Sequence, residues 1–513
     1  MALVILLLLP LLGAAAVAVG RARPAVAWVA VGTNCAALCL GILVAVREIE
    51  IGPLAGAWGL LRADALSAFM VVVIGAIASL ASWLGVRMTA AELADGRSSR
   101  ARATLYLVLV QAFVGNMLLA VLAANVGVLW VAIEATTIVT TFLVGHRRTK
   151  GSLEASWKYI VICSVGIALA FLGTVLVYLA TLHAGGHSAG ALEWTSLMSH
   201  ASHFNAGVMR LAFALIVLGY GTKVGLAPMH SWLPDAHSQA PAPVSALMSG
   251  VLLTVAFYAI LRFKAVTDVA VGPGFSRALL VAVALLSLAL AASLLLTQRD
   301  YKRMLAYHSI EHMGLIALGA AAGIPLAIAA VLLHILGHGL AKSVLFLASG
   351  EIMAVEGTSR IDGIHGLLAR RPALGGVFGV GLLALLGLPP FSLFTSELLM
   401  IRAEFQVGLG WAATAAMVAM VVIFIAVAGH ARHMLFGPAT MPAEAQLAGS
   451  DGVTRPVAAE GSSVLVRVPA TAEHSSPLVT GPLVVGLVAC GVIGVFAWPL
   501  TELLRTAAHV VAP

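Results

Sequence analysis

Apolar segments of membrane-spanning length follow one another along almost the whole chain. A helix that crosses a bilayer needs about 20 mostly apolar residues, and fourteen segments of the 513-residue sequence have this character. With 61% hydrophobic and only 10% charged residues, the chain lacks the composition of a soluble globular protein. The sequence therefore predicts an all-α, polytopic membrane protein with about 14 transmembrane helices. The predicted spans lie near 2–20, 25–46, 65–86, 105–123, 126–145, 157–182, 209–234, 243–263, 278–297, 304–322, 325–349, 373–405, 408–434 and 477–500.

Two of these spans, the seventh and the twelfth, are long and contain helix-breaking residues. The seventh is interrupted at Gly225 and Pro228, and the twelfth at Pro389 and Pro390. Because proline removes a backbone donor and clashes with the preceding turn, we expect discontinuous helices 7 and 12. A break at membrane depth is tolerated only inside protein or beside a watery cavity, and paired broken helices are typical of transporters built from inverted repeats.

The two broken spans are five apart in the series. This spacing predicts two five-helix units of opposite topology, spans 4–8 and spans 9–13. A short internal echo, Ile133-Glu134 in span five and Ile310-Glu311 in span ten, agrees with this division but is weak by itself. The predicted divisions are 1–104 (three N-terminal spans), 105–263 (first repeat), 264–434 (second, inverted repeat) and 435–513 (a cytoplasmic loop and the final span).

The basic residues are distributed unevenly between the two sides of the membrane. Nineteen of the 29 lysines and arginines follow odd-numbered spans, eight follow even-numbered spans and two lie inside spans. Since short cytoplasmic loops carry excess positive charge, both termini are predicted on the non-cytoplasmic side of the cell (inner, cytoplasmic) membrane. The net charge of +7 then reflects orientation and does not indicate nucleic acid as a partner. Segment 436–476 is predicted to be a mobile cytoplasmic loop, and its role is left open.

Ionisable side chains inside the apolar spans are the candidate functional residues, because placing them in lipid is costly and usually serves a function. Glu134 lies in the middle of VLWVAIEATTIVTTFLVG, and Lys223 lies just before the break in span seven. If these two residues pair, each lowers the cost of burying the other, and a proton on one changes the proton affinity of the other. The alternative is that the Glu134 carboxylate is simply hydrogen-bonded to neighbouring threonines.

Span eleven carries a ladder of titratable residues. His334, His338 and Lys342 follow at i, i+4 and i+8 in VLLHILGHGLAKSVLFL, so they are about 6 Å apart along one face of a helix. Histidine titrates near neutral pH, as a proton relay requires. We therefore predict a relay in this span, with structural packing of the histidines as the alternative.

Two further groups lie in spans ten and twelve. His308, Glu311 and His312 share one face of span ten by their i, i+3 and i, i+4 spacing, and they form either part of the relay or a satisfied polar cluster. Glu397 follows the Pro390 break by seven residues and is predicted to be a terminal proton site. Glu404 lies near the outer end of the same span and could simply be exposed.

No cofactor or metal site is expected on this chain. The four cysteines lie in apolar spans without metal-type spacing, and the sequence has no Gly-rich nucleotide loop, haem motif or Cys set for an iron–sulfur cluster. Any electron transfer would therefore belong to partner chains.

The stretch GTKVGLAPMHSWLPDAHSQAPAPVSALMSG resembles the antiporter-like membrane subunits of respiratory complex I, of Mrp sodium/proton antiporters and of membrane-bound (group 4) hydrogenases. RMLAYHSIEHMGLIALG, HILGHGLAKSVLFLASGEI and LPPFSLFTSELLM support the resemblance. Within the family, GYGTKVGLAPMHSWLPDAHSQAP and YHSIEHMG are most similar to hydrogenase-4 component F. The resemblance covers spans 4–13 clearly and the remainder in general layout.

The resemblance implies roles for several residues. Glu134 resembles the conserved glutamate of helix five, and Lys223 resembles the lysine of helix seven with which it pairs. Lys342, with His338 beside it, matches a lysine of helix eleven, and Glu397 matches the acidic residue of broken helix twelve.

One position departs from the family pattern. Thr254 stands where many members have a lysine in span eight, so a path through water, His334 or His338 is expected instead. The proton path of complex I therefore cannot simply be transferred to this chain.

The function implied by the resemblance is that of a proton-translocating membrane subunit in a redox-driven respiratory or hydrogenase complex. Its partners would be other membrane subunits, a peripheral iron–sulfur, nickel–iron or quinone-reducing arm, and the lipid bilayer. Two alternatives remain open at this point: an Mrp-type Na⁺/H⁺ antiporter subunit, and a scaffold that moves no ions. The ladder of buried charges argues against the scaffold, because an inert scaffold has no reason to carry it. The electron donor and acceptor, the coupling stoichiometry and the choice between H⁺ and Na⁺ are not encoded in recognisable motifs.

Overall fold

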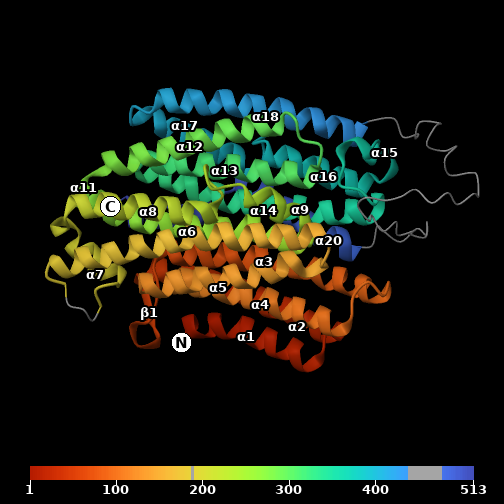
Figure 1. Ribbon diagram of the computed structural model, residues 1–513, viewed down its shortest axis with the longest axis horizontal. Helices are drawn as coiled ribbons and strands as arrows, with labels where there is room; N and C mark the ends of the chain where they lie inside the picture. The colour runs from red at the N-terminus through yellow and green to blue at the C-terminus, as the bar shows by residue number, and fades with distance from the viewer. Residues whose placement is uncertain (187–189, 437–476, 513) are drawn as a thin grey trace, which may run out of the picture.

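The computed structural model describes residues 1–186, 190–436 and 477–512, and most of them are helical. The helices run roughly side by side, with α1 and α2 along one edge of the bundle and α18 along the opposite edge (Figure 1). A small antiparallel hairpin pairs Leu54 with Ala63. The N-terminal elements are α1 (Ala2–Gly20), α2 (Pro24–Ile51), β1 (Leu54–Gly56), β2 (Leu61–Ala63) and α3 (Ala65–Ala94).

The residues assigned to the two predicted five-helix units, whose division remains a prediction, form two consecutive runs of helices. In each run the fourth element is divided into two helices. The first run contains α4 (Arg100–Leu122), α5 (Val126–Val144), α6 (Lys150–His183), the short α7 (Trp194–His200), α8 (Ala206–Val224), α9 (Trp232–Gln239), α10 (Ala242–Leu247) and α11 (Leu253–Val271). The second contains α12 (Pro273–Leu295), α13 (Tyr301–Ala322), α14 (Pro325–Glu356), the short α15 (Leu367–Arg370), α16 (Pro372–Leu385), α17 (Ser392–Gln406) and α18 (Gly410–Phe436). Two helices follow, α20 (Pro477–Val495) and α21 (Trp498–Val511).

Local sequence signals explain where many of these helices begin. A side chain that accepts a hydrogen bond from a backbone N–H of the first turn satisfies one of the unpaired donors there, and proline is favoured at the first helical position. Capping side chains precede α3, α4, α5, α6, α8 and α13, and they are Asp64, Ser99, Asn125, Thr149, Asn205 and Asp300.

The predicted multi-pass membrane architecture is confirmed, whereas the count of fourteen spans remains a prediction. Within the described residues, eleven helices are long and apolar enough to cross a membrane, and the bent pair α20–α21 would make a twelfth. The other two predicted spans coincide with α13, which is rich in polar residues, and with the interrupted pair α16–α17.

Both predicted helix breaks are present. Helix α8 ends at Val224, where Gly225 adopts a left-handed conformation (φ +82°) that only glycine reaches without strain, and α9 begins at Trp232. The second break separates α16, which ends at Leu385, from α17, which begins at Ser392. These breaks interrupt the helices beside the candidate residues Lys223 and Glu397.

The eighth span is longer than predicted, and this corrects the assignment of two basic residues. Arg262 and Lys264 were counted as loop residues, but both are buried inside α11. The Arg262 guanidinium donates to both carboxylate oxygens of Asp64 at 2.6 and 2.5 Å, and Lys264 Nζ lies 2.5 Å from the Asp268 carboxylate. Lys302, a member of the larger group, is likewise buried inside α13, so the count of loop charges changes on both sides of the membrane.

Helix α14 forms the centre of the bundle. All of its most apolar stretch is buried inside the protein, whereas only about a third of the corresponding stretch of α18 is. It packs against α13, α16, α17, α20 and α3, and in Figure 1 it lies in the middle of the helices. The predicted relay residues of span eleven are therefore placed in the interior and not on a lipid-facing surface.

Helix α20 closes the break in span twelve from one side. A Cβ atom added at Gly494 would lie 2.1 Å from the carbonyl oxygen of Pro390 and 2.6 Å from the backbone nitrogen of Ser392. Only glycine fits between these two backbones. We expect Gly494→Val to lower the amount of folded protein and its thermal midpoint, measured after detergent extraction. Gly491→Ala is the matched control, since a Cβ there would meet only ordinary van der Waals contact with Phe391 at 3.8 Å, and equal behaviour of the two variants would contradict the assignment.

Helix α21 was not predicted from the sequence. Its buried side includes Leu503, Leu504 and Ala507, whereas Glu502 and Arg505 are exposed. It bends by 79° from α20 and packs back on α3 and α14. Of the four cysteines, Cys35 and Cys39 are exposed on α2, whereas Cys163 and Cys490 are buried.

Candidate functional site

Lys223 is buried between three helices of the first unit. It lies in the last turn of α8, and its Nζ donates to Thr137 Oγ1 of α5 at 2.6 Å and to the Tyr159 hydroxyl of α6 at 2.9 Å. The ammonium group also lies 5.0 Å from the centroid of the Tyr159 ring. These contacts satisfy a charge that would otherwise be unpaired inside the protein.

Glu134 reaches Lys223 through a hydroxyl group and not by direct contact. Thr137 Oγ1 donates to Glu134 Oε2 at 2.9 Å while it accepts from Lys223. Among the described residues, no nitrogen–oxygen ion pair joins Glu134 and Lys223. Both sequence hypotheses therefore describe part of the geometry, because the glutamate is bonded to a threonine and that threonine connects it to the lysine.

The Glu134 carboxylate lies near the outer surface of this chain. Glu134 is only half-buried, and its neighbours on α5, Val131 and Ile138, are 56% and 53% exposed. A carboxylate open to hydrocarbon is unfavourable by several kcal/mol, roughly. The position calls for a neighbouring protein surface or water beside α5.

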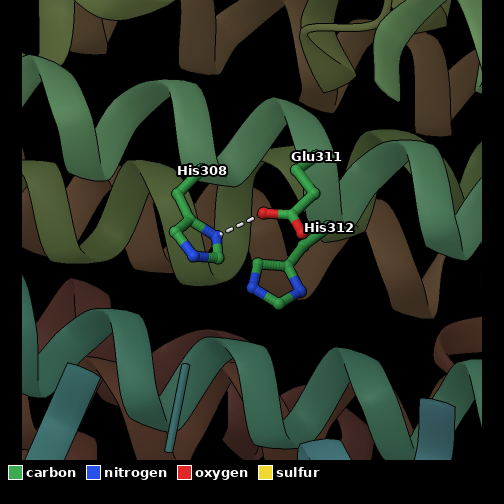
Figure 2. A group of neighbouring side chains, drawn as sticks. All are labelled: His308, Glu311 and His312. Atoms are coloured by element: carbon green, nitrogen blue, oxygen red, sulfur yellow. Dashed lines mark ion pairs between the residues drawn. The ribbon is translucent and has the colours of Figure 1, made fainter. Parts of the chain in front are cut away.

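The second cluster lies on the inner face of α13 (Figure 2). His308 Nδ1 and Glu311 Oε2 are 2.6 Å apart, and the rings of His308 and His312 are stacked with centroids 4.8 Å apart. All three side chains are buried. The shared helical face predicted from the spacing is confirmed.

His312 is the junction between α13 and α14. Its Nδ1 lies 2.9 Å from His334 Nε2, and its ring centroid is 5.1 Å from that of His338. We call His308, His312, His334 and His338 the histidine chain. All four are buried, and the ring of His312 contacts the rings of the other three, so the imidazoles of α13 and α14 meet at this residue.

The chain continues to the broken helix of span twelve. His334 Nδ1 lies 2.9 Å from Ser396 Oγ on α17, and the next residue is Glu397. Donor atoms of His312, His334 and Glu397 all lie within 4.8 Å of one another. A Cβ added at Gly387 would clash with the Glu397 carboxylate, so the backbone at the break gives the carboxylate room to turn toward the histidines.

Lys342 lies two turns from His334 on α14. Its Nζ donates to the carbonyl oxygen of Leu305 and lies 5.9 Å from the Phe346 ring centroid. Neither ring nitrogen of His338, one turn away, has a hydrogen-bond partner within the described part of the chain. His338 is therefore free to bond to a group or water that enters between Lys342 and His312.

The arrangement suits proton transfer between heteroatoms. A neutral imidazole donates from one nitrogen and accepts at the other, so a row of imidazoles can pass a proton by exchanging tautomers. The chain has a carboxylate at each flank, Glu311 and Glu397, and an ammonium group at Lys342. Proximity of such groups is what a relay needs, because each transfer crosses about one hydrogen-bond length.

The same donor set also contains two groups of metal-ligand type. Donor atoms of His308, Glu311 and His312 lie within 4.8 Å of one another, as do those of His312, His334 and Glu397. Imidazole and carboxylate ligands would accept a divalent transition metal. However, His312 and His334 already contact each other and Ser396 through their ring nitrogens, and this arrangement fits a hydrogen-bonded chain.

Span eight contributes no titratable group between the two sites. Thr254 donates to the carbonyl oxygens of Gly250 and Val251, 3.0 Å from each, beside a π-helical segment at Met248–Leu252. Its hydroxyl is thus occupied by its own helix. Span eight therefore has no ionisable side chain at the position where the family pattern has a lysine.

Several residues of the site were missed by the sequence analysis. Thr137 is three residues from Glu134 on the same helix, so its spacing could have revealed it. Tyr159 and Ser396 belong to other helices, and no local pattern marks them. Glu404, considered exposed, is only 3% exposed in the structure.

The fold and these buried charges define a polytopic membrane protein that carries ionisable side chains in its interior. The chain belongs to the family described as NADH:quinone oxidoreductase/Mrp antiporter, transmembrane, whose pattern it matches over residues 123–423. This region begins before α5 and ends within α18, so it includes every candidate residue.

Individual relatives agree with this assignment. The hydrogenase-4 component F homolog of Methylacidiphilum infernorum is 41% identical over 342 residues, which are 67% of this chain and 72% of that protein. The membrane-bound sulfane sulfur reductase, an archaeal respiratory membrane complex, contains a chain that superposes with a TM-score of 0.81 at 25% identity, covering 99% of this chain and 97% of that one. The Mrp complex of Dietzia sp. shares the fold, with a TM-score of 0.82 at 21% identity, over 99% and 96% of the two chains.

Proposed function

We propose that this chain is a proton-translocating membrane subunit of a redox-driven, hydrogenase-4-like or complex I-like assembly. The observation that carries the proposal is the cluster of buried titratable groups that extends from Lys342 through the histidine chain to Glu397. Burying so many ionisable groups is unfavourable unless they serve a function. The family and its hydrogenase-4 relative support the same assignment.

The first site would control the protonation of Lys223. In the resting arrangement, Lys223 donates through Thr137 to Glu134. A proton or charge arriving beside Glu134 weakens its attraction for the lysine, and Lys223 can then release its proton.

The second site would carry the proton toward the other side. His338 can exchange with Lys342, and His312 connects His338 to His334. The histidine chain ends at His334, which lies beside Ser396 and Glu397 at the break in span twelve. Glu311 holds His308 and supplies a negative charge that stabilises a protonated imidazole near His312.

Partner subunits are part of this proposal. The structural relatives belong to multi-subunit membrane complexes, and the half-buried Glu134 requires a neighbour at α5. We propose that other membrane subunits cover this surface. The redox chemistry would reside on a peripheral arm that carries iron–sulfur, nickel–iron or quinone-reducing centres.

The experiment is ion movement in sealed vesicles that contain the whole complex. Adding the electron donor should acidify or alkalise the lumen in proportion to electrons transferred, at the same ratio in sodium-free and sodium-containing buffer. An absolute requirement for Na⁺ would favour an Mrp-type Na⁺/H⁺ antiporter subunit instead. Electron transfer with no ion movement would identify a scaffold and contradict the proposal.

We further propose that both termini face away from the cytoplasm and that the two five-helix units are inverted repeats. The uneven distribution of loop charges supports the orientation, and the start of α1 and the C mark lie toward the same end of the bundle in Figure 1. A C-terminal reporter that works only in the cytoplasm should therefore remain silent. Strong reporter activity would instead show that the C-terminus faces the cytoplasm, and it would contradict the proposed orientation.

A further inference from the structure

The short helix α9 contacts the Lys223 site. Its first residue, Trp232, is buried, and its Nε1 donates to the carbonyl oxygen of Thr222 at 2.8 Å. The indole also packs edge-on against Tyr159, with ring centroids 5.0 Å apart. Thr222 precedes Lys223 in the chain, and the Tyr159 hydroxyl accepts a hydrogen bond from Lys223 Nζ. One end of α9 therefore touches two immediate neighbours of the lysine.

The same helix also contacts the surroundings of Lys342. His237 is stacked on the Phe346 ring, with centroids 5.0 Å apart and an interplanar angle of 16°. Lys342 Nζ lies 5.9 Å from the centroid of this Phe346 ring. All three side chains are fully buried. Within six residues, α9 thus connects the environments of two lysines that belong to different units of the protein.

Charged groups tie α9 to both units. Asp235 Oδ2 lies 3.0 Å from Lys158 Nζ on α6, and Asp235 Oδ1 lies 3.1 Å from Arg303 Nη2 on α13. Lys302, buried at the start of α13, donates to two carbonyl oxygens at the C-terminal end of α9 at 3.0 and 3.1 Å. A cation at this position satisfies carbonyls that a helix end leaves unpaired.

We propose that α9 couples the Lys223 site mechanically to the histidine chain, and that Asp235 is the positioning residue that holds α9 to both units. The proposal rests on the proposed function, since it links its two sites. When Lys223 releases its proton, its bond to Tyr159 changes, and Trp232 rests on Tyr159. A displacement of α9 moves His237 against Phe346 and so alters the surroundings of Lys342.

This link also accounts for the missing lysine of span eight. Thr254 offers no titratable group, so a direct proton relay between Lys223 and Lys342 has a gap there. A rigid element that bridges two sites can transmit energy without carrying a proton, provided that it has two arrangements biased by both sites. Helix α9 lies in position to bridge the two sites, because it contacts Tyr159 at one end and Phe346 near the other.

The test is Asp235→Asn, which removes both ion pairs and preserves the size of the side chain. In vesicles with the whole complex, we expect the ratio of protons moved to electrons transferred to fall about threefold or more, since two ion pairs of modest strength are lost together. The electron-transfer rate and the amount of assembled complex should stay near the wild-type values. Asp235→Glu should restore most of the ratio, because it keeps the charge.

The matched control is Glu154→Gln. Glu154 also pairs with Lys158, at 2.6 Å, but it has no ion pair to the second unit. Its ratio should equal that of the wild type. An unchanged ratio in Asp235→Asn, or a loss that merely follows a loss of assembled complex, would overturn the inference.

Salt provides a readout that a purely structural role would not move. Lys158, Asp235 and Arg303 side chains are 46%, 21% and 41% exposed, so their pairing is screened by ions. Raising the ionic strength from about 0.01 to 1 M should lower the wild-type ratio toward that of Asp235→Asn and leave the variant unchanged. Lys223→Ala is measured in parallel. If it pumps normally, the proposed function fails; if it does not pump while Asp235→Asn does, only the coupling role of α9 fails.

Discussion

Lys223→Ala is expected to abolish proton uptake while electron transfer by the complex continues. The substitution removes the donor to Thr137 and Tyr159 and leaves Glu134 without its cation. Removing one partner of a buried charged pair typically costs about 3–5 kcal/mol, although the partial exposure of Glu134 reduces this cost. The measurement is the ratio of protons to electrons in vesicles that contain the whole complex.

Three further variants define what the lysine does. Lys223→Arg retains the charge but should not restore uptake, because arginine does not lose its proton in proteins. Thr137→Val keeps the shape of the side chain, removes the bridging hydroxyl and should have nearly the same effect as Glu134→Gln. Lys150→Ala removes an exposed lysine at the start of α6 and serves as the control. Normal pumping by Lys223→Ala or Glu134→Gln would show that this group is structural.

His312→Phe is expected to produce the second large effect. His312 contacts His308, His334 and His338, so a ring without nitrogen at this position interrupts the chain in all directions. Phenylalanine is apolar and similar in shape, and the buried site can accommodate it without an unpaired polar atom on the new side chain. We expect proton uptake to be lost while electron transfer and assembly persist.

A second substitution guards against misfolding as the explanation. His312→Gln restores a polar group that can hydrogen-bond to His334 but cannot carry a proton charge near neutral pH, so it should assemble normally and still fail to pump. His430→Gln is the matched control. His430 lies in α18, and its Nε2 contacts the carbonyl oxygen of Leu295; within the described residues it contacts no member of the histidine chain. Wild-type pumping by His312→Gln would remove the histidine chain from the path.

The sequence was sufficient for the membrane class, both helix breaks and the identity of most buried ionisable residues. The position of a membrane span follows from the length and hydrophobicity of one segment, and a helix break follows from the proline and glycine residues within it. Both features are therefore local in the sequence. Lys264 shows where this reasoning ends. A lysine at the end of an apolar run resembles a loop residue, and its pairing with the partly exposed Asp268 one turn later is seen only in the structure.

The geometry of the site depended on contacts between distant segments. His312 and His334 are 22 residues apart and were assigned to separate groups, yet their ring nitrogens meet at 2.9 Å. The sequence offered pairing with Lys223 and bonding to a threonine as alternatives for Glu134, whereas Thr137 Oγ1 joins the two groups. These contacts depend on how the helices pack against one another, and no single segment of the sequence determines that packing. The roles of these residues in proton movement remain predictions.

The hydroxyl of Thr137 implies a two-stroke cycle. It now accepts from Lys223 and donates to Glu134. If a proton hops along this path, the hydroxyl ends with its hydrogen directed at the neutral lysine, and the Glu134 carboxyl becomes the donor. A second proton cannot follow until the hydroxyl has rotated and Lys223 has been recharged from elsewhere. Each transfer must therefore be followed by rotation of the Thr137 hydroxyl, and a second transfer also requires that Lys223 has first regained a proton.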